Sequence, residues 1–232
     1  MAPFAAMSAR SAAERREELV ALYKQLGPDH ECPLKAGRTN IVFGMGNADA
    51  DLMFIGEAPG FHEDQQGKPF VGRAGQLLDE LLAGIGMTRE GDAFIANVLK
   101  CRPPGNRDPQ PEEIDECTPW LMRQIELTEP RVICTLGNFA TKLITQSPVG
   151  ITKCCGRPQD REIAGLPVTV YPLFHPAAAL RTPAVLERLR EDFSRIPELL
   201  AEERAKDAPP SLVGEAVASG AEEPPQLDLF GG

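Results

Sequence analysis

Residues 51–82 read as a buried strand that runs into an unusually long loop and then into an amphipathic helix. The strand is the short apolar run LMFI at residues 52–55, which Gly56 closes. A continuous apolar run of this kind is typical of a central parallel strand covered on both faces. Ordinary strand-to-helix connections have about 2 to 6 residues, whereas this one needs roughly 15, many of them glycine or proline. We therefore predict a binding site at the carboxyl end of this strand. The alternative is an ordinary connection.

The rest of the chain alternates strands and helices. Further strands are expected at residues 93–99, 131–136 and 168–174. Helices are expected at residues 12–26, 73–82, 111–127, 137–144 and 182–200. This alternation predicts an α/β fold, a three-layer α/β/α sandwich with a central, mainly parallel four-stranded sheet. The segments GEAPG, NVLKCRPP, LGN and HPAAAL each begin where a strand ends, so they should meet at one edge of the sheet.

The charge of the chain is unevenly distributed. The formal charge of −10 argues at first against a nucleic-acid partner, but residues 197–232 carry eight acids and only two bases. The remainder has 26 acids and 22 bases, so it can still present a basic face. Basic residues in predicted loops are available for such a face: Lys100, Arg102, Arg107, Lys153, Arg157 and Arg181.

Neither a membrane span nor a secretory signal is expected. No apolar run approaches the roughly 20 residues that a membrane span needs. The N-terminus lacks the basic start and apolar core of a signal peptide. We therefore expect a cytoplasmic protein, a monomer with no membrane partner. Residues 1–204 should form one domain, and the acidic tail at residues 205–232 has a composition that predicts disorder.

Four motifs occur in the order GEAPGFHED, GKPFVGRAG, NVLKCRPPGNR and HPAAAL, together with a characteristic cysteine spacing, between residue 32 and about residue 193. As a set they resemble the iron–sulfur (family 4) uracil-DNA glycosylases. The resemblance implies a monofunctional enzyme of base excision repair that takes deoxyuridine out of the DNA stack. Such an enzyme hydrolyses the N-glycosidic bond, releases uracil and leaves an abasic site.

The resemblance also assigns roles to individual side chains. Asn97 is expected to read uracil, because its amide complements the N3–H donor and the O4 acceptor of the base. Phe70 is expected to stack on the flipped base, and Glu63 to line the C5 side and disfavour the methyl group of thymine. His175 is expected to donate to uracil O2, where negative charge develops as the bond breaks.

Other residues of the motifs are expected to contact the base, the sugar or the DNA. Ala58 stands where related families have an aspartate, so Glu57 is the candidate for positioning water or stabilising the sugar cation. The backbone from Gly56 to Ala58 should contact uracil as well. Arg181 and Arg157 are expected to face the DNA. Each of these residues, considered alone, could have a purely structural role. A lone histidine or phenylalanine is more often part of the packing or of a hydrogen-bond network than of a binding site.

Six cysteines in a chain without a signal peptide indicate metal binding or reactivity before disulfides. By the resemblance, Cys32, Cys101 and Cys117 are ligands of a structural 4Fe-4S cluster. The fourth cysteine of the family pattern is missing. Asp29 stands in its register with His30 beside it, so either the cluster has an unusual ligand, with Asp29 preferred over His30, or it is labile or lost.

The chain ends in PPQLDLFGG, in which Gln226, Leu227, Leu229 and Phe230 resemble the short peptide that docks bacterial replication and repair proteins on the DNA sliding clamp. A disordered tether carrying apolar side chains suits folding on binding. The alternative is an apolar terminus without a partner.

Two rival functions use some of the same residues. A non-catalytic or covalent uracil-DNA binding protein would share the pocket. Relatives that trap DNA covalently have a basic, histidine-containing insertion before HPxxxL, however, and residues 154–167 contain no histidine. A ferredoxin-like electron carrier would use the cysteines but would leave Asn97, Phe70 and His175 unexplained.

Overall fold

Four parallel strands form the centre of the sheet. In the computed structural model, which describes residues 10–206, they lie in the order β3 (Ala93–Asn97), β2 (Leu52–Gly56), β4 (Val132–Leu136) and β6 (Leu166–Leu173). Every residue of β2, β3 and β4 is buried, as expected for apolar strands covered on both faces. The predicted α/β fold with its mainly parallel sheet is therefore confirmed.

Two antiparallel strands extend the four predicted ones to a six-stranded sheet. β1 (Met45–Gly46) pairs with β3 at one edge, and β5 (Gln159–Ile163) pairs with β6 at the other. β5 is mostly exposed and polar, so its sequence resembles a loop. Residues 41–43, which lead into β1, are not part of a strand.

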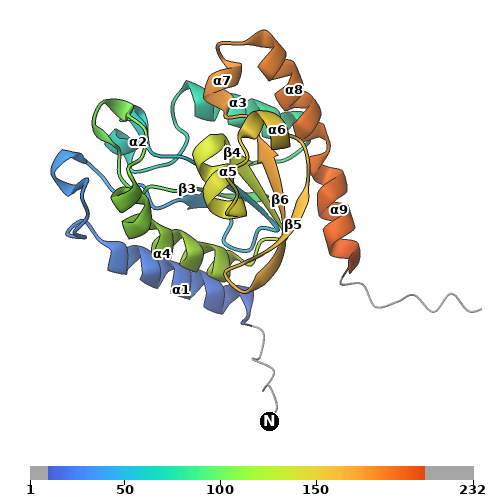
Figure 1. Cartoon of the computed structure of the whole chain (residues 1–232). Coiled ribbons are helices and arrows are strands. Elements are labelled where there is room, and N and C mark those ends of the chain that lie inside the picture. Colours follow the sequence, from blue (N-terminus) through green and yellow to red (C-terminus); the bar gives the residue numbers. More distant parts are fainter. Residues whose placement is uncertain (1–9, 207–232) are drawn as a thin grey trace, which may run out of the picture.

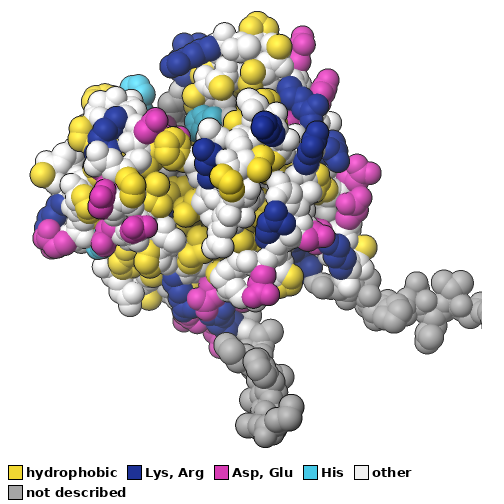
Figure 2. All heavy atoms as spheres, in the orientation of Figure 1, with side chains coloured by type: hydrophobic (Ala, Val, Ile, Leu, Met, Phe, Trp, Pro, Cys, Tyr) yellow, Lys and Arg dark blue, Asp and Glu magenta, His cyan; other side chains and the backbone are white. Residues whose placement is uncertain are grey.

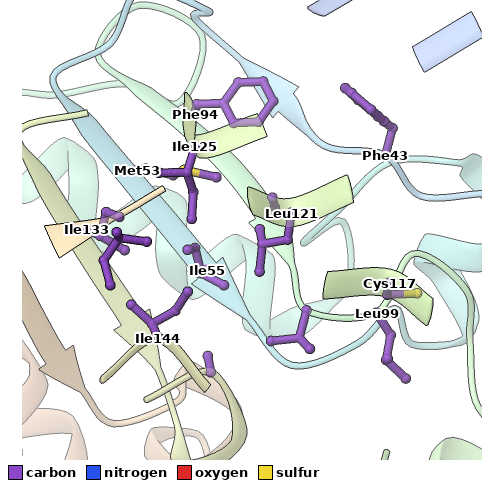
Figure 3. Packing of buried hydrophobic residues seen from close by; sticks show 14 of the residues in the cluster. Phe43, Met53, Ile55, Phe94, Leu99, Cys117, Leu121, Ile125, Ile133 and Ile144 are labelled. Carbon is purple, nitrogen blue, oxygen red and sulfur yellow. The ribbon is translucent and has the colours of Figure 1, made fainter. Parts of the chain in front are cut away.

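One layer of helices covers the face of the sheet to which Met53 and Ile55 point. These side chains pack against α4 (Pro111–Thr128) and α5 (Asn138–Thr145), and the labelled side chains in Figure 3 show this packing. α1 (Ala12–Leu26) lies along α4 on the same side (Figure 1). The alternation of side chains along β2 thus directs every second residue into this layer.

The second layer covers the opposite face, to which Leu52 and Phe54 point. It consists of α3 (Arg73–Gly84), α8 (Pro183–Ser194) and α9 (Ile196–Lys206). The rings of Phe54 and Phe193 stack with their centroids 5.6 Å apart. The two layers complete the predicted three-layer sandwich.

The helix expected at residues 182–200 is two helices, α8 and α9, which meet at Arg195. Pro197 explains the break, because proline lacks the N–H that would continue the helical hydrogen bonds and disfavours a helical residue before it. α9 continues to Lys206, just past the expected domain boundary at residue 204.

Short helices occupy the connections, including the long loop after β2. They are α2 (Phe61–Gln66), α6 (Ile151–Cys154), α7 (Pro176–Ala179) and the 3-10 turns Lys35–Gly37 and Pro104–Asn106. Within residues 10–206, no helix is long and apolar enough to cross a bilayer. The motif with Gln226, Leu227, Leu229 and Phe230 lies outside the described residues.

Candidate active site

A pocket of about 460 Å³ opens where β2, β3 and β6 end. It collects side chains that are far apart in the sequence, as the convergence of the strand ends predicts. Its lining includes the predicted residues Glu57, Ala58, Glu63, Phe70, Asn97, His175 and Arg181. The surface is indented between the part that covers α2 and the part that covers α7 and α8 (Figure 2).

Asn97 is the last residue of β3, and its side chain is almost completely buried. Among residues 10–206 the side-chain amide of Asn97 has no hydrogen-bond partner, although it lines the pocket. The amide is therefore available to a ligand that offers one donor and one acceptor. The backbone carbonyl of Asn97 accepts a hydrogen bond of 2.8 Å from Lys100 Nζ, which fixes the end of the strand.

Gly56 lies beneath the pocket at the end of β2, paired in register with Asn97. A Cβ atom at this position would overlap Asn97 Oδ1 and would lie 2.6 Å from Cζ of Phe70. Glycine is required here by the close approach of two side chains rather than by its own dihedral angles. Gly56 does not itself line the pocket, and a larger residue there would displace the side chains of Asn97 and Phe70, which do.

Phe70 lies in a left-handed backbone conformation, with φ of 53°, in the turn before α3. Glu63 holds this turn, because its Oε1 accepts hydrogen bonds of 3.0 Å from the backbone N–H groups of Val71 and Gly72. The rings of Phe70 and His175 are stacked at 26° with centroids 5.7 Å apart. Glu63 therefore positions the aromatic ring in addition to lining the pocket.

His175 caps the N-terminus of α7, and its Nδ1 accepts a hydrogen bond of 3.1 Å from Ala177 N–H. Burial lowers the pKa of His175 to about 4, and the negative charge of Glu63 opposes this only in part. Near neutral pH the ring is therefore uncharged. Because Nδ1 is the acceptor, the proton of the neutral ring is on Nε2. The side chain thus offers one N–H donor to the pocket.

Glu57 follows β2 directly and lines the pocket. Burial raises the pKa of its carboxyl, with a further contribution from the negative charge of Asp108. A carboxyl group in this position can orient a water molecule or face a positive charge on a sugar.

The two predicted DNA-contacting arginines lie in different places. Arg181 lines the pocket mouth beyond α7, whereas Arg157 is exposed on the connection between α6 and β5 and does not line the pocket. Lys and Arg side chains are spread over the α7 and α8 side of the indentation (Figure 2).

Among the lining residues that were not assigned to the uracil site, three come from the segment after β3: Pro103, Asn106 and Arg107. Arg107 forms an ion pair of 2.5 Å with Glu113, which is 2% exposed. The sequence indicates that these residues belong to the site, because they lie in the motif NVLKCRPPGNR, directly after the strand that ends at Asn97.

Lys100 is buried at 1% exposure, so it does not belong to a basic face. Its ammonium group donates to the Asn97 carbonyl and, over 2.6 Å, to Gln124 Oε1. Burial lowers the pKa of Lys100 to about 7, against the opposing influence of Cys117 and Cys101. Lys100 thus joins the end of β3 to α4 and lies beside the cysteines.

Two of the three predicted cysteine ligands are in contact, and hydrogen bonds link Arg38 and Lys100 to the set. Cys32 Sγ and Cys101 Sγ are 3.6 Å apart, and Arg38 Nη1 lies 3.3 Å from the first and 3.4 Å from the second. Cys117 Sγ accepts a hydrogen bond of 3.4 Å from the backbone N–H of Lys100. Burial raises the pKa of Cys101 to about 12. A guanidinium, a buried ammonium and a backbone N–H beside three thiols fit an anionic, thiolate-bound group.

The fourth position of this cysteine site is not a thiol. Asp29 is exposed, and the ring of His30 packs edge-on against Trp120 with centroids 5.2 Å apart. His30 Nε2 lies 3.4 Å from Glu116 Oε1 without forming a hydrogen bond. Within the described residues, no three Cys, His, Asp or Glu side chains are arranged to hold a metal ion together.

Comparisons with known proteins agree with this site. The model of the uracil DNA glycosylase superfamily matches residues 43–197. The type-4 uracil-DNA glycosylase of Archaeoglobus fulgidus is 44% identical over 187 residues, which cover 79% of this chain and 94% of that protein. That of Thermotoga maritima is 47% identical over 168 residues, or 72% of this chain and 85% of that protein. The chain therefore belongs to the uracil-DNA glycosylase superfamily, within its type-4 enzymes.

Proposed function

We propose that the protein hydrolyses the N-glycosidic bond of deoxyuridine that has been extruded from DNA, releases uracil and leaves an abasic site. The observation that carries this proposal is the meeting of an unpaired amide, an aromatic ring and a neutral imidazole in one pocket, from Asn97, Phe70 and His175. The comparisons support it, because proteins named type-4 uracil-DNA glycosylases are 44% to 47% identical to this chain over 72% to 79% of its length. Nothing favours the alternative of a protein that captures uracil DNA without turnover.

Recognition rests on the edge of the base. Uracil presents N3–H as a donor and O4 as an acceptor, and the Asn97 amide presents the complementary pair. Cytosine reverses this pattern at the same two positions, so a fixed amide leaves buried polar groups unpaired and rejects cytosine. Gly56 leaves room for the side chains of Asn97 and Phe70. Phe70 stacks on the base, and Glu63 lines the side where thymine carries its methyl group.

Bond cleavage places negative charge on the departing uracil, chiefly at O2, and positive charge on the sugar. The N–H on Nε2 of the neutral His175 ring donates to O2 and stabilises this charge more in the transition state than in the ground state. Glu57 either orients the attacking water or stabilises the sugar cation. Arg181 and Arg157 supply positive charge toward the DNA phosphates.

We further propose that Cys32, Cys101 and Cys117 hold a 4Fe-4S cluster, with Asp29, or alternatively His30, as the fourth ligand. When bound, the cluster supplies a cross-link between the N-terminal loop and the loop after β3. The two cations beside the thiols support an anionic group at this place. Iron and sulfide analysis of anaerobically purified protein should give stoichiometric iron, and its absence would remove the cluster from this account.

The remaining parts of the proposal concern the whole chain. We propose a cytoplasmic monomer with one domain at residues 1–204 and a tail at residues 205–232 that binds the DNA sliding clamp. Deleting residues 226–232 should abolish clamp binding and leave uracil excision intact. Unchanged affinity for the clamp would contradict the role given to Gln226, Leu227, Leu229 and Phe230.

One assay tests the central proposal. Oligonucleotides with U:G, U:A or single-stranded U are incubated with protein and then heated in alkali, which cleaves abasic sites. The wild type should produce strand cleavage, and Asn97→Ala should lose most of it because the base is no longer read. A shifted but uncleaved band with the wild type would instead establish a binding protein without turnover.

A further inference from the structure

An exposed aromatic ring lies at the rim of the pocket. Phe61, the first residue of α2, is 52% exposed, and Arg102 Cζ lies 5.2 Å from the centroid of its ring. The His62 ring meets the Phe61 ring edge-on, with centroids 5.5 Å apart. A phenylalanine with this exposure gains little from burial. Its packing against a cation and a second ring nevertheless restrains where it points.

One hydrogen bond and one position in the chain place this ring beside the pocket. Arg102 Nε donates a hydrogen bond of 2.6 Å to Asn106 Oδ1, and Asn106 lines the pocket. On the other side, Phe61 follows Gly60, which also lines the pocket. Phe61 and Arg102 therefore each lie next to a residue that lines the pocket, Gly60 and Asn106.

Arg102 has capacity for a further partner. Across residues 10–206 its only hydrogen bond uses Nε, so both terminal nitrogens are available to an acceptor. A nucleotide beside the extruded one offers an anionic phosphate to a guanidinium and a flat π-face to a phenyl ring.

We propose that Phe61 and Arg102 form a stacking site for the nucleobase that neighbours the extruded uracil in the same strand, with Arg102 facing the phosphate between them. This inference rests on the proposed glycosylase function. The site holds the strand at the base beside uracil, where the duplex has opened, and its contribution is independent of base identity because every base has a π-face.

Paired single-stranded substrates test the stacking. One oligonucleotide carries normal bases on both sides of uracil, and the other carries tetrahydrofuran spacers there, which keep the phosphates but lack the bases. The wild type should prefer the base-flanked substrate by about 5- to 100-fold in kcat/KM. Phe61→Ala should lose this preference and Phe61→Trp should restore it. Tyr23→Ala is the matched control, because Tyr23 is an aromatic residue on α1 with 55% exposure that does not line the pocket.

The phosphate contact has its own readout. Arg102→Gln should make the affinity for DNA less steeply dependent on salt, by about the share of one phosphate. The fluorescent base 2-aminopurine can be placed on the 5′ or the 3′ side of the excised position in product DNA. On one of these two sides, its fluorescence should be quenched less by Phe61→Ala than by the wild type.

The outcomes separate this inference from the proposed function. If the wild type excises no uracil, the proposed function fails. If the wild type excises uracil but has the same preference for flanking bases as Phe61→Ala, there is no stacking site. An effect of Phe61→Ala confined to duplex substrates would place the contact on the opposite strand and would also overturn the inference.

Discussion

The protonation state of His175 is the part of the mechanism that the structure defines most closely, and lowering the pH tests it. The pKa of the ring falls from its ordinary value of 6.5 to about 4 on folding, because burial penalises the charged imidazolium. Between these two values the unfolded chain binds a proton that the folded chain does not. Stability from the neutral ring is therefore complete above 6.5 and is lost as the pH falls toward 4.

The size of this loss follows from the two pKa values. Going from about pH 7.5 to about pH 5, His175 alone should lower the free energy of unfolding by about 2 kcal/mol. The full loss of unfolding free energy is about 3 kcal/mol, and it is reached only at a pH below both pKa values. An imidazole that titrated normally in the folded protein would contribute nothing to this change.

Urea unfolding of the wild type and of His175→Asn at both pH values isolates this contribution. Asparagine does not titrate and can still accept the hydrogen bond from Ala177 N–H at the start of α7. The other titrating groups are common to both proteins, so the loss of stability on acidification should be about 2 kcal/mol larger in the wild type. Parallel losses would show that the pKa of His175 is not lowered on folding and that burial does not penalise its charged form.

Two further substitutions test how the pocket is supported. Gly75→Ala would add a Cβ that overlaps the carbonyl oxygen of Phe70, so it should displace the ring and lower kcat/KM by about 5- to 100-fold, the value of one stacked base. Gly84→Ala in the same helix meets no atom within 4 Å and should leave excision unchanged. Lys100→Met leaves two buried carbonyl oxygens without their donor, one of them on Asn97, and should lower the free energy of unfolding by about 2 to 4 kcal/mol in urea titrations. A stable Lys100→Met protein with full activity would show that the ammonium does not position Asn97.

The sequence predicted those parts of the fold that depend on continuous apolar runs. Residues 52–55 and 132–136 are apolar on both faces, and this pattern has few alternatives to a central parallel strand. β5 could not be predicted in this way, because Gln159–Ile163 is polar and becomes a strand only through pairing with β6. The break at Pro197, by contrast, follows from proline chemistry and was available in the sequence.

The sequence predicted the site residues wherever a motif follows a strand, because parallel strands bring their carboxyl ends together. The sequence did not predict the role of Lys100, since a lysine after a strand is usually solvated. Its burial is understandable only with Gln124 of α4, whose side-chain oxygen supplies an acceptor from another part of the chain.

The short segment from Asn97 to Cys101 links the amide that is proposed to read the base to the cysteine site. Asn97 ends β3, Lys100 holds its carbonyl, and the next residue is a proposed cluster ligand. The backbone N–H of Lys100 meanwhile donates to Cys117 on α4. Lys100 therefore contacts both sites, because its ammonium group fixes the strand end that presents the Asn97 amide and its backbone N–H holds the thiol of Cys117.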